Sequence, residues 1–229
     1  MIPAWNEAER IEATVRSAVA TDVEVMVVDG GSRDATATRA AAAGARVLTS
    51  ERGRAVQLAR GVDATSGDVL VFLHADTTLP MGWPGAVAAA LGDPAVVGGA
   101  FAFRFERRGD ARLGFALALV EWGARLRVAL FGFPYGDQAL FVRRGALAIA
   151  GGVPQTPFME DLDLVAALRR QGRLALLALP AVTSARRYRA RGPLRAMLRN
   201  WAAAFGWWLG LDRARVAAWY HRAGGPGPR

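Results

Sequence analysis

Short runs of apolar, often β-branched residues alternate with alanine- and arginine-rich stretches over the first part of the chain. We predict the apolar runs to be strands at residues 23–28, 45–49 and 69–74. The stretches with helical composition cover residues 7–20, 34–43 and 54–65. This alternation is typical of βαβ units around a largely parallel sheet.

The connections between the predicted elements become longer after Pro80. There the pattern predicts helices at residues 83–91, 113–130 and 160–171, a helical turn at 145–149, and strands at 96–105, 139–143 and 174–179, the last ended by Pro180. We therefore expect one domain over residues 1–190, helices over 191–223 packed on it, and a disordered Gly/Pro-rich tail at 224–229. Only two residues precede Pro3, fewer than a full first strand needs, and the sequence leaves open whether the native start lies upstream of Met1.

The composition excludes several kinds of site and classes of protein. A length of 229 residues with 52% hydrophobic content supports a real core. The absence of cysteine excludes disulfides and thiolate zinc sites, and two histidines exclude a multi-histidine metal centre. No apolar run is long enough to span a membrane and the N-terminus lacks the features of a signal peptide, so we expect a cytoplasmic protein.

Charge is unevenly distributed. Residues 1–100 carry 12 acidic residues and 8 arginines, whereas residues 101–229 carry 8 acidic residues and 21 arginines. All 29 basic residues are arginine, a bias that coding composition explains as readily as phosphate binding.

Asp29 ends an apolar strand and is followed by Gly30, Gly31 and Ser32. Ligands in α/β sheets bind beyond the carboxyl ends of the strands, where this carboxylate would reach a ribose or a base. A βα loop with a capping Ser32 or Asp34 explains the same residues equally well.

His74 and Asp76 end another buried run. If the strand continues through them, residues two apart point to one side, and the Asp76 carboxylate would hold a divalent cation on a diphosphate. For His74 we favour a half-buried structural role over a metal ligand.

Glu160, Asp161 and Asp163 open a predicted helix, where the helix dipole favours negative charge. Adjacent acids at a loop-to-helix junction also suit a general base, and we favour that role for Glu160 and Asp161.

Two further groups of residues are candidate contacts to the donor or acceptor sugar or to the diphosphate. Tyr135, Asp137 and Gln138 lie in a glycine- and proline-rich loop, where turn chemistry is the alternative explanation. Arg186 and Arg187 begin a basic run after a strand, which would give guanidinium contacts to a diphosphate or would simply be a solvated loop.

The region after residue 190 predicts an amphipathic basic-aromatic helix. Arginines recur at Arg191, Arg195 and Arg199, beside an aromatic stripe that comprises Met197, Trp201, Phe205 and Trp208. We expect the stripe to pack on the domain, with peripheral contact to an anionic membrane as the alternative that Trp207 and Leu211 support. No module typical of RNA binding occurs, and we expect no nucleic-acid partner.

Several motifs occur in register along the chain: Pro3-Ala4-Trp5-Asn6-Glu7, Val27-Val28-Asp29-Gly30-Gly31-Ser32-Arg33-Asp34, His74-Ala75-Asp76 and Glu160-Asp161. Over nearly the whole chain this series resembles glycosyltransferase family 2, the inverting GT-A enzymes. The closest resemblance is to the bacterial radical-SAM/selenodomain-associated transferases, through His74-Ala75-Asp76-Thr77, Glu121-Trp122-Gly123, Tyr135-Gly136-Asp137-Gln138, Met159-Glu160-Asp161 and Ser184-Ala185-Arg186-Arg187-Tyr188.

The resemblance implies an α/β GT-A fold, a Rossmann-like mixed and mostly parallel sheet flanked by helices that binds a nucleotide sugar. It implies a UDP-sugar donor and a divalent cation, Mn²⁺ or Mg²⁺. It implies that Asp161 is the catalytic base and that Asp76 ends the metal-binding acid motif, in which His74 replaces the usual first Asp. It also implies nucleotide contacts from Pro3, Asn6, Glu7, Asp29, Asp34, Arg52 and Arg54.

The predicted reaction is a single displacement with inversion, in which Asp161 deprotonates an unidentified acceptor hydroxyl. A sugar-phosphate nucleotidyltransferase is an alternative, although residues 1–7 lack a glycine-rich triphosphate loop. A non-catalytic module that binds membranes or nucleic acid through the basic C-terminal part is another.

Overall fold

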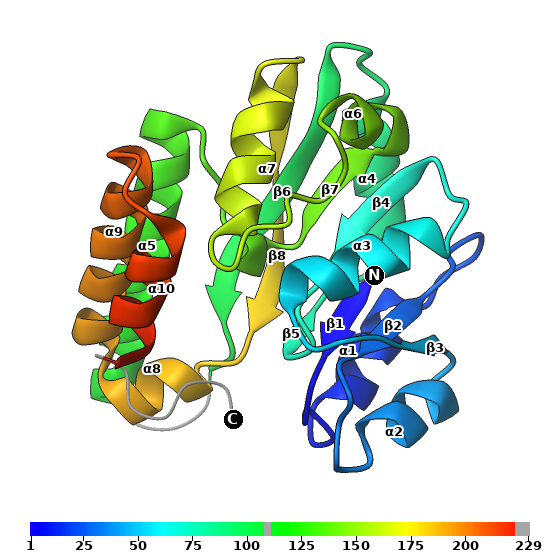
Figure 1. The fold of residues 1–229 in the computed structure, drawn as a ribbon, viewed down its shortest axis with the longest axis horizontal. Helices are drawn as coiled ribbons and strands as arrows, with labels where there is room; N and C mark the ends of the chain where they lie inside the picture. Colours follow the sequence, from blue (N-terminus) through cyan, green and yellow to red (C-terminus); the bar gives the residue numbers. More distant parts are fainter. Residues whose placement is uncertain (108–110, 223–229) are drawn as a thin grey trace.

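The computed structural model describes residues 1–107 and 111–222 (Figure 1). The predicted tail at 224–229 lies outside the described residues. Helices and strands alternate in the first half, as the sequence predicts, and helices dominate the last quarter of the chain.

The N-terminal sheet consists of three parallel strands, β1 (Ile2–Ala4), β2 (Met26–Asp29) and β3 (Arg46–Thr49), in that order. Between them run α1 (Ile11–Ala18) and α2 (Thr36–Ala42), and α3 (Arg54–Asp63) follows β3. Parallel pairing brings the carboxyl ends of β1 and β2 to one edge, where Ala4 pairs with Asp29. This edge carries the predicted nucleotide motifs.

A second sheet has the strand order β4-β7-β6-β8-β5. Its strands are β4 (Val69–Phe72), β5 (Thr77–Thr78), β6 (Val96–Phe105), β7 (Leu140–Arg143) and β8 (Arg173–Thr183). Only β6 and β8 are parallel there, so this part is mixed. Met1 joins the two sheets, because its amine donates to the Val71 carbonyl at 2.7 Å and its carbonyl accepts from the Leu73 amide at 2.9 Å.

Helices cover both faces of this joined sheet. Apolar residues of α1, α2 and α4 (Trp83–Leu91) pack with Phe101 and Phe141 on one face. Those of α3, α6 (Arg144–Ile149) and α7 (Glu160–Arg169) pack with Leu140 and Val142 on the other. Neighbouring residues of one strand thus serve opposite layers, as a period of two requires.

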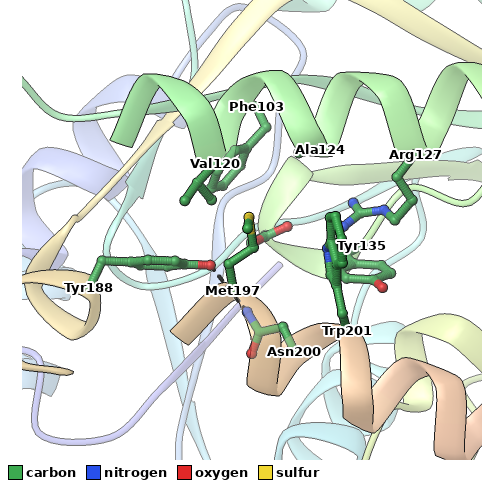
Figure 2. A pocket seen from close by; sticks show the side chains of 10 residues that line it. Phe103, Val120, Ala124, Arg127, Tyr135, Tyr188, Met197, Asn200 and Trp201 are labelled. Carbon is green, nitrogen blue, oxygen red and sulfur yellow. Dashed lines mark hydrogen bonds between the residues drawn. The ribbon is translucent and has the colours of Figure 1, made fainter. Parts of the chain in front are cut away.

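A helical layer stands at the end of the molecule away from α2 (Figure 1). It comprises α5 (Ala111–Phe131), α8 (Arg186–Arg191), α9 (Pro193–Trp208) and α10 (Arg213–Arg222). A cavity of about 20 Å³ lies between α5 and α9, and its lining includes Tyr135 and, from the 3₁₀ turn η1 (Gly136–Gln138), Asp137 (Figure 2). No described helix is long and apolar enough to cross a membrane.

Two differences from the predicted strand ends affect the site. Strand β4 ends at Phe72, so His74 and Asp76 lie in a turn and their predicted strand-like orientation does not hold. Strand β8 continues through Pro180 to Thr183, because a register irregularity between Phe101 and Ala102 of β6 accommodates the proline. The basic run after β8 forms helix α8, where a loop was the alternative to a binding site.

The predicted packing of α9 was wrong for half of its stripe. Met197 packs against the cluster around Phe105, and Trp201, 46% exposed, lies against α5 at Gly123, but Phe205 and Trp208 are exposed by 59% and 71%. The buried positions are Ala203 and Gly206, and Gly206 lies against Val216 of α10. The helix therefore packs by its small residues and by one edge of the stripe, and the rest of the aromatic row faces outward.

Candidate functional site

The loop after β1 is fastened to the loop after β2. Asn6 adopts a positive φ of 52°, and its amide donates to Oγ of Ser32 at 2.8 Å. Its Oδ1 accepts from the Arg33 amide at 2.9 Å. The Glu7 amide donates to Oγ1 of Thr36 at 2.8 Å. Backbone amides and short polar side chains thus hold residues 5–8 against the start of α2.

Asp29 and Asp34 also help to hold these two loops together. Asp29 is buried, and its carboxylate accepts from the Ser32 amide at 2.8 Å and from the Ser32 hydroxyl at 2.5 Å. Asp34 accepts from the amide of Ala8 at 3.2 Å and from Thr36. Partial desolvation raises the pKa of Asp34, but these hydrogen bonds outweigh it and leave the pKa below its usual value.

The loop before α3 closes over the same edge. The Arg52 guanidinium lies 3.6 Å from the centre of the Trp5 ring. Behind it, the buried Gln57 amide donates to the carbonyls of Ala4 and Val28 at 2.9 and 2.7 Å. Pro3, one residue earlier on β1, pairs with Val28. The predicted nucleotide residues of the first half therefore form one connected surface at the strand ends.

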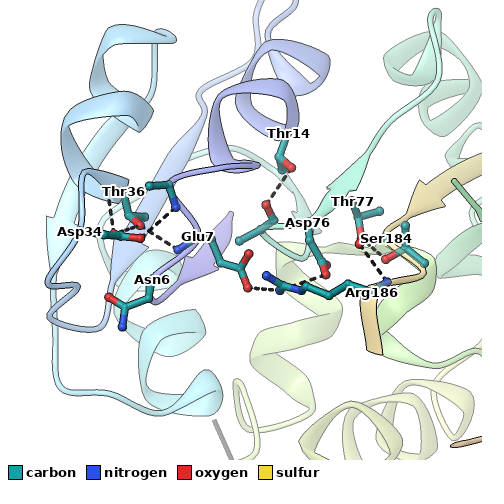
Figure 3. A network of polar contacts seen from close by, with 12 residues as sticks. Asn6, Glu7, Thr14, Asp34, Thr36, Asp76, Thr77, Ser184 and Arg186 are labelled. Atoms are coloured by element: carbon teal, nitrogen blue, oxygen red, sulfur yellow. Dashed lines mark hydrogen bonds and ion pairs between the residues drawn. The ribbon is translucent and has the colours of Figure 1, made fainter. Parts of the chain in front are cut away.

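Arg186 joins this surface to the end of β4 (Figure 3). Its Nη2 donates to Oε1 of Glu7 at 2.5 Å and lies 3.6 Å from Oδ2 of Asp76. The side chains of Glu7 and Asp76 are only 16% and 10% exposed. The hydrogen bond to Glu7 raises the pKa of Arg186 above its usual value, so the guanidinium is a permanent cation between two carboxylates.

The turn that carries Asp76 is held by its backbone. The Thr14 hydroxyl donates to the Ala75 carbonyl at 2.9 Å, and the Ser184 amide donates to the Asp76 carbonyl at 3.1 Å. The His74 carbonyl accepts from the Thr77 amide at 3.1 Å. Asp76 thus has a fixed position without using its carboxylate. Beside it opens a cleft of about 280 Å³ lined by Glu9, Arg10, Ala13, Thr14, Asp76, Thr78, Glu106, Val182, Thr183 and Ser184.

Asp161 lies in a second polar group at the start of α7. Its Oδ2 accepts from the Gly136 amide at 2.6 Å, and its Oδ1 accepts from the Leu162 amide at 3.0 Å. A Cβ at position 136 would clash with the Arg54 guanidinium and lie 2.9 Å from Oδ2 of Asp161. A side chain at position 136 would therefore have to displace the Arg54 guanidinium and the Asp161 carboxylate.

Glu160 pairs with the cation of the same group. Nη1 of Arg54 lies 3.2 Å from Oε1 of Glu160, whose side chain is 10% exposed. Burial raises the pKa of Glu160, the Arg54 charge opposes this, and the neighbouring Asp161 adds to the rise. Arg54 thus links α3, which borders the nucleotide loop, to the two predicted catalytic acids.

The loop residues 135–138 divide into two roles. Gln138 is buried, and it accepts from Nη2 of Arg127 at 3.0 Å and donates to the Phe101 carbonyl at 3.2 Å, so it is structural here. The Arg127 guanidinium also lies 3.3 Å from the centre of the Tyr135 ring. Burial raises the pKa of Tyr135. Tyr135 and Asp137 face the cavity of Figure 2.

The described contacts bring most, but not all, of the predicted residues together. Asp29 and Asp76 are connected through the loop that holds Asn6 and Glu7. Asp161 lies in a separate group, in which the neighbouring Glu160 pairs with Arg54 on α3. The side chain of Arg187 lies outside the described part. Among the described residues no group of three or more His, Asp or Glu side chains is arranged to hold a metal ion.

Sequence reasoning did not find Thr36 or Gln57 as parts of the site, and it named Gly136 only as a member of the loop motif at 135–138. Gln57 could have been found, because it is a polar residue at a core-facing position of an amphipathic helix. Thr36 could not, since its role depends on which distant loops come together.

Comparison with known proteins bears on these assignments. The glucosyl-3-phosphoglycerate synthase of Mycobacterium tuberculosis is 38% identical over 94 residues, which cover 35% of this chain and 29% of that protein. The match thus spans less than a third of the relative's length.

Solved structures of the Mycobacterium tuberculosis synthase are similar over most of the fold. Its complex with Mn²⁺, uridine-diphosphate-glucose and phosphoglyceric acid has a TM-score of 0.64 at 25% identity and covers 92% of this chain and 79% of that chain. Its complex with Mg²⁺ and uridine-diphosphate has a TM-score of 0.61 at 25% identity, with coverage of 92% and 78%. The predicted GT-A-like α/β fold is confirmed by this likeness. Residues 1–145 match the family described as Glycosyl transferase family 2, and because this is more than half of its length, the chain belongs to glycosyl transferase family 2.

Proposed function

We propose that the chain transfers a hexose from a UDP-sugar to an acceptor hydroxyl by a single inverting displacement. The observation that carries the proposal is the bridge from Glu7 through Arg186 to Asp76, which ties the nucleotide-type loops to the acid that ends the β4 turn. UDP-glucose and phosphoglyceric acid, both held by the related synthase, are the first donor and acceptor to test.

The donor would lie along the strand-end surface. Pro3, Asn6, Asp29, Asp34, Arg52 and Arg54 are the proposed nucleotide contacts. The mutual fastening of their loops supports this role, because a site assembled before the ligand arrives loses less entropy on binding. Arg186 and Arg187 would meet the diphosphate, whose oxygens match the guanidinium fork. Tyr135, Asp137 and Gln138 remain proposed contacts or supports for the sugars.

Oxygen ligands near Arg186 fit a divalent cation. Mg²⁺ is usually held by one or two carboxylates together with substrate phosphates, so a cluster of three protein ligands is not required. Asp76 supplies one carboxylate, and the buried Oε2 of Glu7 has no hydrogen-bond partner among the described residues. Mn²⁺ or Mg²⁺ held there by Asp76, with His74 as a further candidate ligand, would neutralise charge on the departing diphosphate.

Asp161 would act as the general base. The Gly136 and Leu162 amides each bind one of its oxygens, which fixes the carboxylate plane and leaves a lone pair free on each oxygen for an acceptor proton. Glu160 is the second carboxylate that we propose for the catalytic group. Its ion pair with Arg54 would hold the start of α7 in place while Asp161 carries the proton.

The subgroup of the chain and its division into domains are further parts of the proposal. We place the chain close to the radical-SAM/selenodomain-associated transferases on the motifs around Asp76, Asp137, Glu160 and Arg186. We also propose that residues 1–190 form the catalytic domain and that the later helices pack on it. Two bonds support this packing: Oδ1 of Asp163 accepts from Nε1 of Trp207 at 2.7 Å and from Nη2 of Arg213 at 2.9 Å.

Asp161→Asn tests the mechanism. We expect turnover of UDP-glucose, measured as UDP release in the presence of phosphoglyceric acid and Mn²⁺, to fall by about 10²–10⁴ while UDP binding is kept. Asp68→Asn is the matched control, because it makes the same chemical change at an exposed aspartate just before β4, at the opposite end of that strand from the Asp76 turn. Equal activity of wild type and Asp161→Asn would refute the base assignment.

A further inference from the structure

A row of large apolar side chains on α5 faces solvent. The row consists of Phe115, Leu119, Trp122, Leu126 and Leu130, which are exposed by 76%, 47%, 59%, 41% and 66%. Their spacing of three and four residues places them on one face of the helix. A whole face of this kind is unusual for a helix that only packs on its own domain.

Helix α9 carries a second row of the same kind. It consists of Leu194, Leu198, Trp201, Phe205 and Trp208, with exposed fractions of 58%, 54%, 46%, 59% and 71%. Helix α9 buries Ala203 and Gly206 against its neighbours instead, and Trp207 is turned inward to Asp163. The outward direction of the aromatic row therefore follows from packing that the helix has already satisfied.

The two rows adjoin. A Cβ on Gly123 of α5 would lie 3.6 Å from Cζ2 of Trp201 and 3.8 Å from Sδ of Met197, so α9 rests on α5 at this glycine. Leu119 and Leu126 flank Gly123 on the surface of α5. Figure 1 shows the two helices side by side at the edge of the molecule. The rows together form one surface, the α5/α9 face.

Arginine dominates the charge of the helices that carry and adjoin the α5/α9 face. Helices α5, α8, α9 and α10 contain 12 arginines and a single acid, Glu121, which is buried and paired with Arg107 at 2.8 Å. Three of these arginines, Arg127, Arg186 and Arg213, bind Gln138, Glu7 and Asp163 and do not belong to the face. Exposed Arg125 follows Trp122 by three residues, and exposed Arg195 is next to Leu194. Cations beside exposed tryptophan, phenylalanine and leucine are typical of helices that lie in the interface of an anionic bilayer.

We propose that the α5/α9 face binds the surface of a bilayer that contains anionic phospholipids. The helices would lie in the headgroup region, in keeping with the absence of a described helix able to cross a membrane. A second copy of the chain is the less suitable occupant, because it would bring two arginine-rich faces together with no exposed acid on these helices to pair with them. Trp201 and Met197 also line the cavity of Figure 2 with Tyr135 and Asp137, so bilayer contact would occur one layer from these proposed sugar contacts.

Vesicle flotation of the full chain tests the proposal. We expect co-flotation with vesicles of phosphatidylcholine and phosphatidylglycerol at a ratio of about 7:3, little with phosphatidylcholine alone, and partial release at high salt. Phe205→Glu with Trp208→Glu should reduce the bound fraction at least about tenfold. Arg125→Gln and Arg195→Gln should each weaken partitioning by about fivefold.

The matched control is Met81→Glu with Ile149→Glu, which places the same charges on apolar residues exposed by 98% and 77% outside the α5/α9 face. This control should bind vesicles like the wild type, and all variants should melt like the wild type, since the substituted side chains are exposed. Equal flotation of the wild type and the Phe205/Trp208 variant would overturn the proposal. So would no flotation of the wild type, or a wild-type dimer in solution that the same two substitutions dissociate.

Discussion

The strand-end surface and the α5/α9 face place their residues in opposite ways. At the strand ends, polar side chains are drawn in and fixed by backbone groups: Asp29 is buried against Ser32, and Asp76 is held by Thr14 and Ser184 contacts to its turn. On α5 and α9, large apolar side chains point outward, although α5 already packs through Leu117 and Val120 and α9 through Ala203 and Gly206. Fixed polar groups suit a small polar ligand, whereas a broad exposed apolar surface suits an extended partner.

Arg186 connects the basic C-terminal part of the chain to the strand-end surface. It belongs to the basic C-terminal part by sequence, but its guanidinium lies between Glu7 and Asp76 of the acidic part. The charge asymmetry along the chain therefore has a local use. A cation from one half neutralises carboxylates of the other and is in place for a diphosphate.

The largest effect on the strand-end surface is expected from Arg186→Gln. Charge-assisted hydrogen bonds contribute about 1.5–3 kcal/mol, so we expect UDP binding measured by calorimetry to weaken by roughly 10–100-fold. Arg173→Gln is the matched control, because it removes another surface arginine that pairs with an acid, Asp93, away from the site. Unchanged UDP affinity in Arg186→Gln would separate the basic half from donor binding.

Asp163→Asn should weaken the attachment of the helical layer. The change removes the charge that Arg213 and the Trp207 indole share, with side chains of Arg213 and Asp163 that are 26% and 22% exposed. We expect a loss of about 1–2 kcal/mol in the free energy of unfolding, measured by urea denaturation. If stability does not change, the layer is held by apolar contacts alone.

Glu160→Gln should change how stability depends on pH. The folded protein holds the pKa of Glu160 above its ordinary value of 4.5, mainly because the side chain is buried. A raised carboxyl pKa contributes stability that is fully present below pH 4.5 and is lost as the pH rises through the folded value. The melting temperature of the variant relative to wild type should therefore rise between about pH 4.5 and neutral pH, and a constant or falling difference would contradict the assignment.

Much of the strand-end surface could be predicted from sequence, because it depends on local patterns. Strand β6 and helix α4 lie at the predicted residues, and the acids after β2 and β4 follow from apolar runs that end in polar groups. The turn at His74 and the continuation of β8 past Pro180 could not be read locally. Both depend on pairing with distant strands, through Thr77 with Thr183 and Ala102 with Pro180.

The orientation of the α5/α9 face, in contrast, could not be predicted from the sequence. The period of the aromatic row on α9 identified one face of a helix, and the same period fits burial against a domain and exposure to a bilayer. Which face turned inward was decided by Gly206 and by the bond from Trp207 to Asp163, contacts with α10 and α7 that no local pattern reports.

The central claim is that the strand ends and Arg186 form a site for a nucleoside diphosphate. Calorimetric titration of UDP into the full chain with Mn²⁺ tests it most directly, with Asp76→Asn measured beside the wild type. We predict binding at one site per chain in the wild type and a loss of at least about tenfold in affinity in the variant. Absence of UDP binding by the wild type, or equal binding by Asp76→Asn, would contradict it.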